Sequence, residues 1–171
     1  DKPVISIGGY AFNSCNGLTN VTVPDSVTSI GRFAFGYCSN MTSVTIPDSV
    51  TSIGQDAFWG CSNLLSVTIP DSVTSIENMT FRNCGNLASV IIGNKVKSIG
   101  RWAFRDCSNL TNVTIPKNLT QIGSWAFSGC SSLKSITFEG NAPSSFGSEV
   151  FKNLPIEATI TVTAGATGFG A

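Results

Sequence analysis

The 171-residue chain contains no histidine, and only 12% of its residues carry a charge. Histidine is the commonest general base and a frequent zinc ligand, so its absence argues against His-dependent nucleophilic catalysis and against Cys/His metal sites. The acidic residues are scattered singly along the chain, which leaves no paired carboxylates for acid–base catalysis. We therefore expect a protein that is not an enzyme and that uses no cofactor and no metal ion.

Long apolar runs and an excess of charge of either sign are missing as well. No stretch approaches the length of about 18 apolar residues that a membrane span requires. Basic and acidic residues balance at ten each, so the net charge gives no general case for binding nucleic acid or a membrane surface. Serine, threonine and asparagine must supply the polar surface, a composition that suits an extracellular protein.

What the chain does have is a strict period of 23 residues. Five apolar columns keep this period, and so do all the cysteines. The cysteine column consists of Cys15, Cys38, Cys61, Cys84, Cys107 and Cys130. The phenylalanine column consists of Phe12, Phe35, Phe58, Phe81, Phe104 and Phe127. Written out, the unit is L-x-x-V-T-I-P-D-S-V-T-S-I-G-x-x-A-F-x-x-C-S-N, which identifies a tandem-repeat protein.

Each part of the unit predicts a local structure. The alternation V-T-I suits a short strand with one buried face, and the proline that follows ends it because proline donates no amide hydrogen. In G-x-x-A-F-x-x-C the apolar positions are four apart, which predicts a short helical face of about two turns at roughly 3.6 residues each. A unit of this length fits one coil of a solenoid, whose neighbours stack to bury a common core.

These residues resemble the BspA-like leucine-rich repeats, whose pattern is L-x-x-V-x-I-P-x-x-V-x-x-I-G-x-x-A-F-x-x-C. The resemblance covers nearly the whole chain. It implies an α/β, mainly β, leucine-rich-repeat solenoid: a right-handed, curved stack of parallel strands with short helical or irregular segments on the other side. It also implies a secreted or cell-surface location and a role in adhesion to host matrix proteins or to other cells. The family consensus contains no catalytic motif and fixes no binding residues.

The repeats also suggest boundaries. Residues 1–140 read as six repeats, the first of them truncated; residues 141–163 read as a degenerate seventh repeat that acts as a C-terminal cap; and residues 164–171 read as a tail or linker. In the seventh repeat Leu154 replaces the cysteine. Because the chain starts inside a repeat, we expect it to be part of a longer protein with further repeats or domains.

The cysteine column has three possible meanings. A metal site needs paired ligands such as C-x-x-C, and a nucleophile needs a base, and the sequence offers neither. Disulfides between adjacent coils are conceivable, because stacked Cα atoms about 5 Å apart lie within the allowed range. The same position belongs to the internal apolar pattern, however, which favours buried free thiols that pack as small hydrophobes.

Two surfaces are candidate binding sites. The first is the strand face, where side chains at alternate positions point away from the core. Its central column consists of Thr22, Thr45, Thr68, Ile91, Thr114 and Thr137. A solvated sheet face, a surface for a protein or glycan partner, and an ice-binding surface are the alternatives here.

The second surface is a flank on which large aromatic and basic side chains gather. Its residues are Trp59, Arg82, Arg101, Trp102, Arg105 and Trp125. Residues 77–134 hold seven basic and two acidic side chains, so this flank could bind an acidic partner such as a sulfated glycan or an acidic protein surface. The alternative is that the aromatic side chains only pack between coils.

The sequence thus favours a non-catalytic, extracellular or cell-surface binding module that recognises a host or neighbouring-cell protein or glycan through its solenoid faces. The alternative is a passive spacer or scaffold that displays another domain of a longer protein. Neither hypothesis involves nucleic acid or insertion into a membrane.

Overall fold

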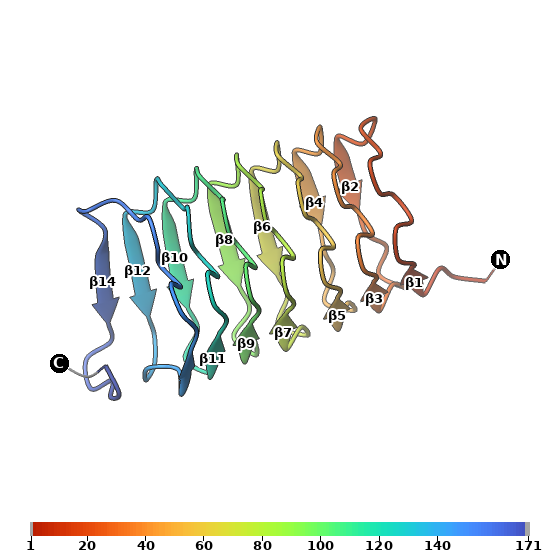
Figure 1. The fold of residues 1–171 in the computed structure, drawn as a ribbon. Helices are drawn as coiled ribbons and strands as arrows, with labels where there is room; N and C mark the ends of the chain where they lie inside the picture. Colours follow the sequence, from red (N-terminus) through yellow and green to blue (C-terminus); the bar gives the residue numbers. More distant parts are fainter. Residues whose placement is uncertain (1, 170–171) are drawn as a thin grey trace.

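The computed structural model describes residues 2–169 as a row of stacked coils, each containing one longer and one shorter strand (Figure 1). The longer strands form a seven-stranded sheet, and the shorter ones form two sheets of three and four strands. The seven-stranded sheet contains β2 (Asn20–Thr22), β4 (Ser43–Thr45), β6 (Ser66–Ile69), β8 (Ser89–Ile92), β10 (Asn112–Ile115), β12 (Ser135–Phe138) and β14 (Thr159–Val162). The three-stranded sheet contains β1 (Ser6–Ile7), β3 (Ser29–Ile30) and β5 (Ser52–Ile53). The four-stranded sheet contains β7 (Ser75–Ile76), β9 (Ser98–Ile99), β11 (Gln121–Ile122) and β13 (Ser145–Phe146).

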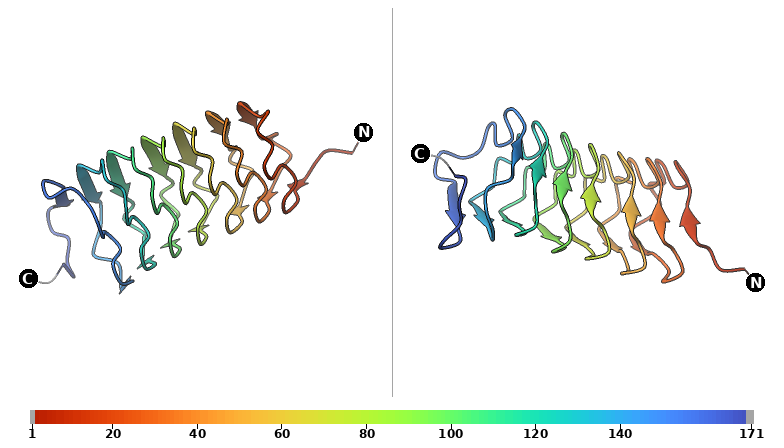
Figure 2. Two further views of the ribbon diagram at one scale, coloured as in Figure 1. Left: turned by 45° about the horizontal axis from the view of Figure 1, so that its top comes forward. Right: turned by 90° about the horizontal axis from the view of Figure 1, so that it is seen from below.

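All strand pairs are parallel, and every strand except β5 pairs with the equivalent strand of the next coil where one follows. Ser66 pairs with Ser89, 23 residues later, whereas Ser135 pairs with Thr159, because the last repeat is one residue longer. Figure 2 shows the two rows of strands on different sides of the coils, with the chain ends at opposite ends of the row. The coils are numbered by repeat: coil 2 comprises residues 18–40, coil 3 residues 41–63, coil 4 residues 64–86, coil 5 residues 87–109 and coil 6 residues 110–132.

The segment after each short strand is not helical, so the prediction of short helical segments was wrong: residues 2–169 contain no helix. In coil 2 the amides of Phe33, Phe35 and Tyr37 donate to carbonyl oxygens of the following coil at 2.6–3.2 Å, while the amides between them donate three residues back. An α-helix would need these amides to bond four residues back. The φ angles of Phe33 (54°) and Tyr37 (58°) are also left-handed, which breaks a right-handed helix.

The core consists of the predicted apolar columns, stacked as ladders. The phenylalanine rings follow one another from Phe12 to Phe151 with centroid separations of 5.2–5.7 Å and interplanar angles of 3–19°. Phe58, Phe81 and Phe104 are fully buried. Burying a large aromatic side chain contributes about 1.5–3 kcal/mol to stability, and each ring pair adds about 0.5–1.5 kcal/mol. This internal stack therefore links every coil to its neighbours.

The row of short strands is interrupted between coils 3 and 4, where β5 and β7 belong to different sheets. In the other coils the residue after the short strand is glycine; the amide of Gly54, for example, donates to the Ile30 carbonyl at 2.8 Å. Coil 4 has Glu77 instead, and within residues 2–169 its amide makes no such bond. A Cβ atom at Gly54 would lie 2.7 Å from the backbone nitrogen of Arg32, so a side chain at this position forces neighbouring coils apart.

Replacing Glu77 with glycine should close this gap. The amides of Thr74 and residue 77 would then pair with coil 3, as the equivalent amides of the next coil, Lys97 and Gly100, pair with coil 4. A net hydrogen bond is worth about 1 kcal/mol, so hydrogen exchange at these two amides should slow about fivefold. Glu77→Gln is the matched control, because it removes the charge and keeps the Cβ atom. Equal protection in both variants would show that charge, and not the Cβ atom, opens the sheet.

Candidate functional site

The strand face is exposed and polar, as predicted. In its central column Thr22, Thr45, Thr68 and Thr114 are exposed, and Thr137 is half-buried. Their hydroxyl groups make no hydrogen bond to any part of the chain between residues 2 and 169. The column two residues earlier in each repeat behaves differently, because the Ser43 hydroxyl donates a hydrogen bond to the Asn20 side-chain oxygen at 2.7 Å. The threonine column therefore offers unoccupied hydroxyl groups in a row across the sheet.

Two apolar side chains interrupt this polar face. Ile91, which replaces threonine in the central column, is 61% exposed, and Leu65, just before β6, is 54% exposed. Ile91 belongs to the predicted site residues, whereas Leu65 does not. Alignment of the repeats could have identified Leu65 as an apolar exception, because the equivalent residues of the preceding coils are Thr19 and Thr42.

The aromatic and basic flank forms a continuous ladder of stacked groups. The Arg82 guanidinium lies between Trp59 (5.1 Å to the ring centroid) and Trp102 (5.7 Å). The Arg101 guanidinium lies over Trp102 (3.7 Å) and Trp125 (4.7 Å), and these two indole rings stack on each other at 5.8 Å. The structure thus brings together five of the six residues predicted for this flank.

The ladder continues toward the N-terminus through residues that were not predicted as site residues. Trp59 packs against Phe33 at 5.6 Å and against Tyr37 at 5.4 Å, and Phe33 stacks on Tyr10 at 5.1 Å. Arg32 lies over Phe33 at 5.2 Å. The signal for this extension was the period itself, because Tyr10, Phe33, Trp102 and Trp125 occupy one column of the repeat.

The four arginines of the flank differ in their acidic partners. Arg32 contacts the buried Asp56 carboxylate at 3.2 Å, and Arg105 contacts Asp106 at 3.2 Å. Arg105 makes no stacking contact with a tryptophan among the described residues. Arg82 and Arg101 have no carboxylate within 4.0 Å in the described part of the chain. The unpaired positive charge of the flank is therefore concentrated on coils 4 and 5.

All six cysteines are free thiols; Cys38 to Cys130 form a buried ladder, whereas Cys15 is half-buried. Each thiol from Cys38 onward donates a hydrogen bond to the carbonyl oxygen of the phenylalanine 26 residues earlier, with distances of 3.0 Å for Cys38 and 3.2 Å for Cys84. Burial raises the pKa of the Cys84 thiol from its ordinary value of 9.0 to about 12, and it raises the pKa of Cys61 and Cys107 strongly too. These thiols are held protonated, which makes them poor nucleophiles.

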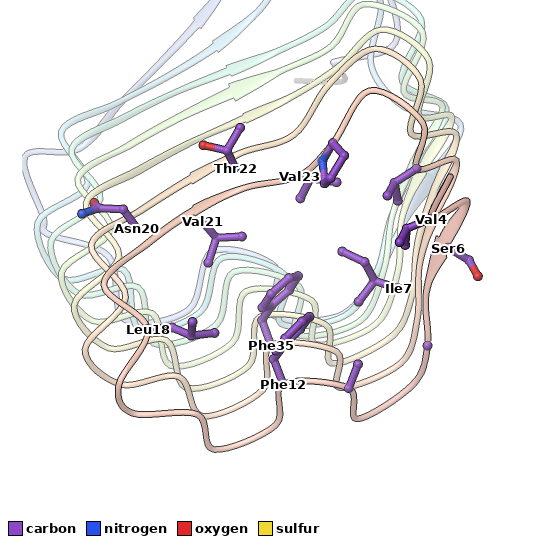
Figure 3. A pocket seen from close by; sticks show the side chains of 14 residues that line it. Val4, Ser6, Ile7, Phe12, Leu18, Asn20, Val21, Thr22, Val23 and Phe35 are labelled. Atoms are coloured by element: carbon purple, nitrogen blue, oxygen red, sulfur yellow. The ribbon is translucent and has the colours of Figure 1, made fainter. Parts of the chain in front are cut away.

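The N-terminal end of the solenoid contains a hollow of about 500 Å³. Figure 3 shows Ile7, Phe12, Leu18 and Val21 pointing into the coil, whereas Asn20 and Thr22 point outward. The inward side chains belong to the apolar columns that are buried in the central coils. The hollow is therefore the uncovered end of the core, and it lacks the converging polar groups that usually orient a small ligand.

Residues 2–169 contain no group of three or more His, Cys, Asp or Glu side chains that could hold a metal ion. The same part of the chain has no helix long and apolar enough to cross a membrane.

Comparison with known proteins identifies the repeat. The sequence model of the BspA type leucine rich repeat region matches in six copies, over residues 1–107 and 51–170. The crystal structure of the Treponema pallidum leucine rich repeat protein (TpLRR) has 33% sequence identity and a TM-score of 0.81, with 91% of this chain and 74% of that chain covered. No curated protein matches.

Two more distant structures share the fold. A leucine-rich repeat protein from Eubacterium ventriosum has 24% identity and a TM-score of 0.65, with 88% of this chain and 46% of that chain covered. One from Bacteroides ovatus has 22% identity and a TM-score of 0.55, with 94% and 64% covered. The repeat pattern, the stacked parallel coils and the match over nearly the whole sequence lead to one conclusion: the chain belongs to the family of BspA-type leucine-rich-repeat proteins.

Proposed function

We propose that this chain is a non-catalytic binding module of a cell-surface or secreted protein, and that it recognises a protein or glycan of a host or neighbouring cell. Leucine-rich-repeat solenoids are typically non-enzymatic binding scaffolds, which supports the general class. The observation that carries the proposal is the exposed threonine column, whose hydroxyl groups make no hydrogen bond within residues 2–169. Hydroxyl groups spaced about 4.8 Å apart on a rigid sheet can bind a partner without a large loss of entropy.

The apolar pair on the same face supports this proposal. Ile91 and Leu65 expose apolar surface within a polar surround, which is the arrangement of many protein-binding surfaces. Their positions in coils 4 and 5 place any contact near the middle of the sheet, where neighbouring strands hold the backbone on both sides. The proposed surface is thus rigid and needs no rearrangement before it binds.

The proposal can be tested with immobilised extracellular-matrix proteins. Replacing Thr45, Thr68 and Thr114 together by lysine should weaken binding by about tenfold or more, because the partner would have to desolvate three added charges. The matched control replaces Ser52, Gln121 and Ser145 by lysine, since all three are exposed on the small sheets. Thermal unfolding should confirm that both variants fold.

Binding that survives the threonine changes would exclude the strand face. No binding of the wild-type chain to any matrix protein or cell would favour the passive spacer over the binding module.

A further inference from the structure

All four arginines and all three tryptophans of the chain lie on the aromatic and basic flank. Stacking on an indole face holds a guanidinium group flat and leaves its N–H edge free to bind an oxyanion. Arg82 and Arg101 are stacked in this way and lack a carboxylate partner in residues 2–169. Two preorganised cationic groups without a counter-charge are therefore present on adjacent coils.

Unused hydrogen-bond donors gather at the same place. Within the described residues, Trp59 Nε1, Arg82 Nε and Trp102 Nε1 are buried and have no acceptor. Arg105 Nε lies 3.2 Å from the Asp106 carboxylate but off the line of a hydrogen bond. Buried polar groups without a partner are rare in folded proteins, and each needs an explanation. The two unpaired acceptors, Asn13 Oδ1 and Asp56 Oδ1, lie on earlier coils. The unpaired donors of coils 4 and 5 therefore add to the positive potential of this flank, which favours an anionic partner at its surface.

The positive charge continues from this flank around the coils. In the sequence, Lys97 and Arg101 lie on either side of β9. A surface hollow of about 510 Å³ is lined by Lys95, Lys97 and Asn118, together with Thr74 and Thr120. Lys117 follows in the next coil, and none of these lysines has a carboxylate within 4.0 Å among residues 2–169. Two acidic side chains lie close to this band: Glu77, which accepts a hydrogen bond from the Ser75 hydroxyl at 2.6 Å, and Asp71, which accepts one from the Asn94 amide at 2.6 Å. The unpaired cations thus form a band across coils 4 to 6.

We propose that this band, from Arg82 and Arg101 to Lys95, Lys97 and Lys117, binds a sulfated polysaccharide. This inference rests on the proposed binding function and names one ligand class for it. A band of separate cations suits a linear polyanion better than a single small ion. The planar fork of arginine binds the oxygen atoms of a tetrahedral oxyanion in pairs, and sulfate esters present such oxygens repeatedly.

Two other polyanions fit the surface less well. Single-stranded nucleic acid binds through bases that stack on open aromatic faces, but the face of Trp102 is occupied by Arg82, Arg101 and Trp125. Acidic peptides often add a strand to a free sheet edge. The strands β9 and β11 of coils 5 and 6 are paired on both sides, and the unpaired edge of β7 in coil 4 faces β5 of the preceding coil too closely to admit another strand.

The test uses heparin as the probe and the intrinsic tryptophan fluorescence as the signal. Since all the tryptophans lie on the flank, heparin bound there should change the emission in a saturable way, and added salt should weaken the binding. Replacing Arg82 and Arg101 together by glutamine should weaken heparin binding at least about tenfold, because charge-assisted hydrogen bonds are lost. The charge-matched control combines Lys2→Gln with Lys134→Gln, both exposed and outside the band, and it should bind heparin like the wild type.

Three further arms decide the outcome. The double change of Arg82 and Arg101 to lysine keeps the charge but loses the planar fork, so it should give an intermediate loss. Desulfated heparin and polyglutamate should bind much more weakly than heparin. Heparin binding that is unchanged in the folded arginine-to-glutamine variant, or equal binding of desulfated heparin or polyglutamate, would overturn the proposal. Neither result would affect the binding of matrix proteins to the strand face, which is measured separately.

Discussion

Raising the pH above about 9 should unfold this protein, because the buried thiols of the core must lose their protons when the chain opens. In the folded chain, burial raises the pKa of Cys84 and Cys130 to about 12, and it raises the pKa of Cys61 and Cys107 as well. An unfolded thiol ionises at its ordinary pKa, which is 9.0. Between these two pH values the native state binds more protons than the unfolded state, so the free energy of unfolding falls as the pH rises.

The size of this effect follows from the number of thiols. Each thiol that stays protonated in the native state and ionises on unfolding lowers the free energy of unfolding by about 1.4 kcal/mol per pH unit. Four such thiols give a slope of about 5 kcal/mol per pH unit, against a total stability of about 5–15 kcal/mol for an ordinary domain. We expect unchanged stability below about pH 8 and unfolding within about one to three pH units above 9. Urea unfolding at a series of pH values, followed by circular dichroism, measures the slope.

Two single variants isolate the contribution of the buried thiols to this slope. Cys84→Ala should reduce the slope by about 1.4 kcal/mol per pH unit, although its loss of packing lowers the stability at neutral pH. Cys15→Ala should leave the slope unchanged, because this thiol is only partly buried and does not belong to the hydrogen-bonded ladder. Equal slopes for Cys84→Ala and the wild type would rule out the thiol ladder as the cause of alkaline unfolding.

The thiol ladder also shows how far the repeat pattern alone could predict the core. The period placed each cysteine in an apolar column, and the prediction of buried free thiols was correct for Cys38 to Cys130. The pattern could not show that each Sγ donates to a phenylalanine carbonyl 26 residues earlier, because that bond depends on the distance between stacked coils. A cysteine treated as a small hydrophobe therefore accounts for only part of its role.

Contacts between neighbouring coils, which the repeat pattern does not reveal, also explain why the helical prediction was wrong. Positions four apart in G-x-x-A-F-x-x-C are compatible with a helix, and the residues that adopt left-handed φ angles include Phe33, Met79 and Trp102, which are not residue types that indicate such a conformation. Gly60 and Gly129 hinted at it, as did Asp56, Asn83 and Asp106, because glycine, asparagine and aspartate are enriched in the left-handed region. The competing hydrogen bonds come from the next coil, so local sequence spacing cannot reveal them. On the flank, composition identified the arginines, but their pairing depends on where individual carboxylates lie.

Replacing Phe81 by alanine should destabilise the protein strongly, because this residue lies in the middle of the phenylalanine ladder. Its ring is fully buried between those of Phe58 (5.3 Å) and Phe104 (5.4 Å), so the change removes two ring contacts and leaves a cavity. Truncation of a buried phenylalanine costs about 3–5 kcal/mol, which for a chain of this size lowers Tm by about 10–15 °C. Phe12→Ala is the matched control, since Phe12 is 40% exposed and stacks on only one ring, and it should cost about 1–2 kcal/mol.

The location of Phe81 adds a second expectation, because coil 4 already lacks the short-strand pairing with coil 3. The stability of a solenoid is approximately the sum of the stabilities of its coils and of the contacts between neighbours. Phe81→Ala weakens the contact between coils 3 and 4, which the missing strand pairing at Glu77 has already reduced. The coils before and after this contact should therefore unfold in separate steps. Hydrogen exchange resolved along the chain would detect this as unequal protection of residues 18–63 and 87–132. Adding Glu77→Gly should restore a single transition, whereas a single transition in Phe81→Ala alone would show that the seven-stranded sheet is sufficient to couple the coils.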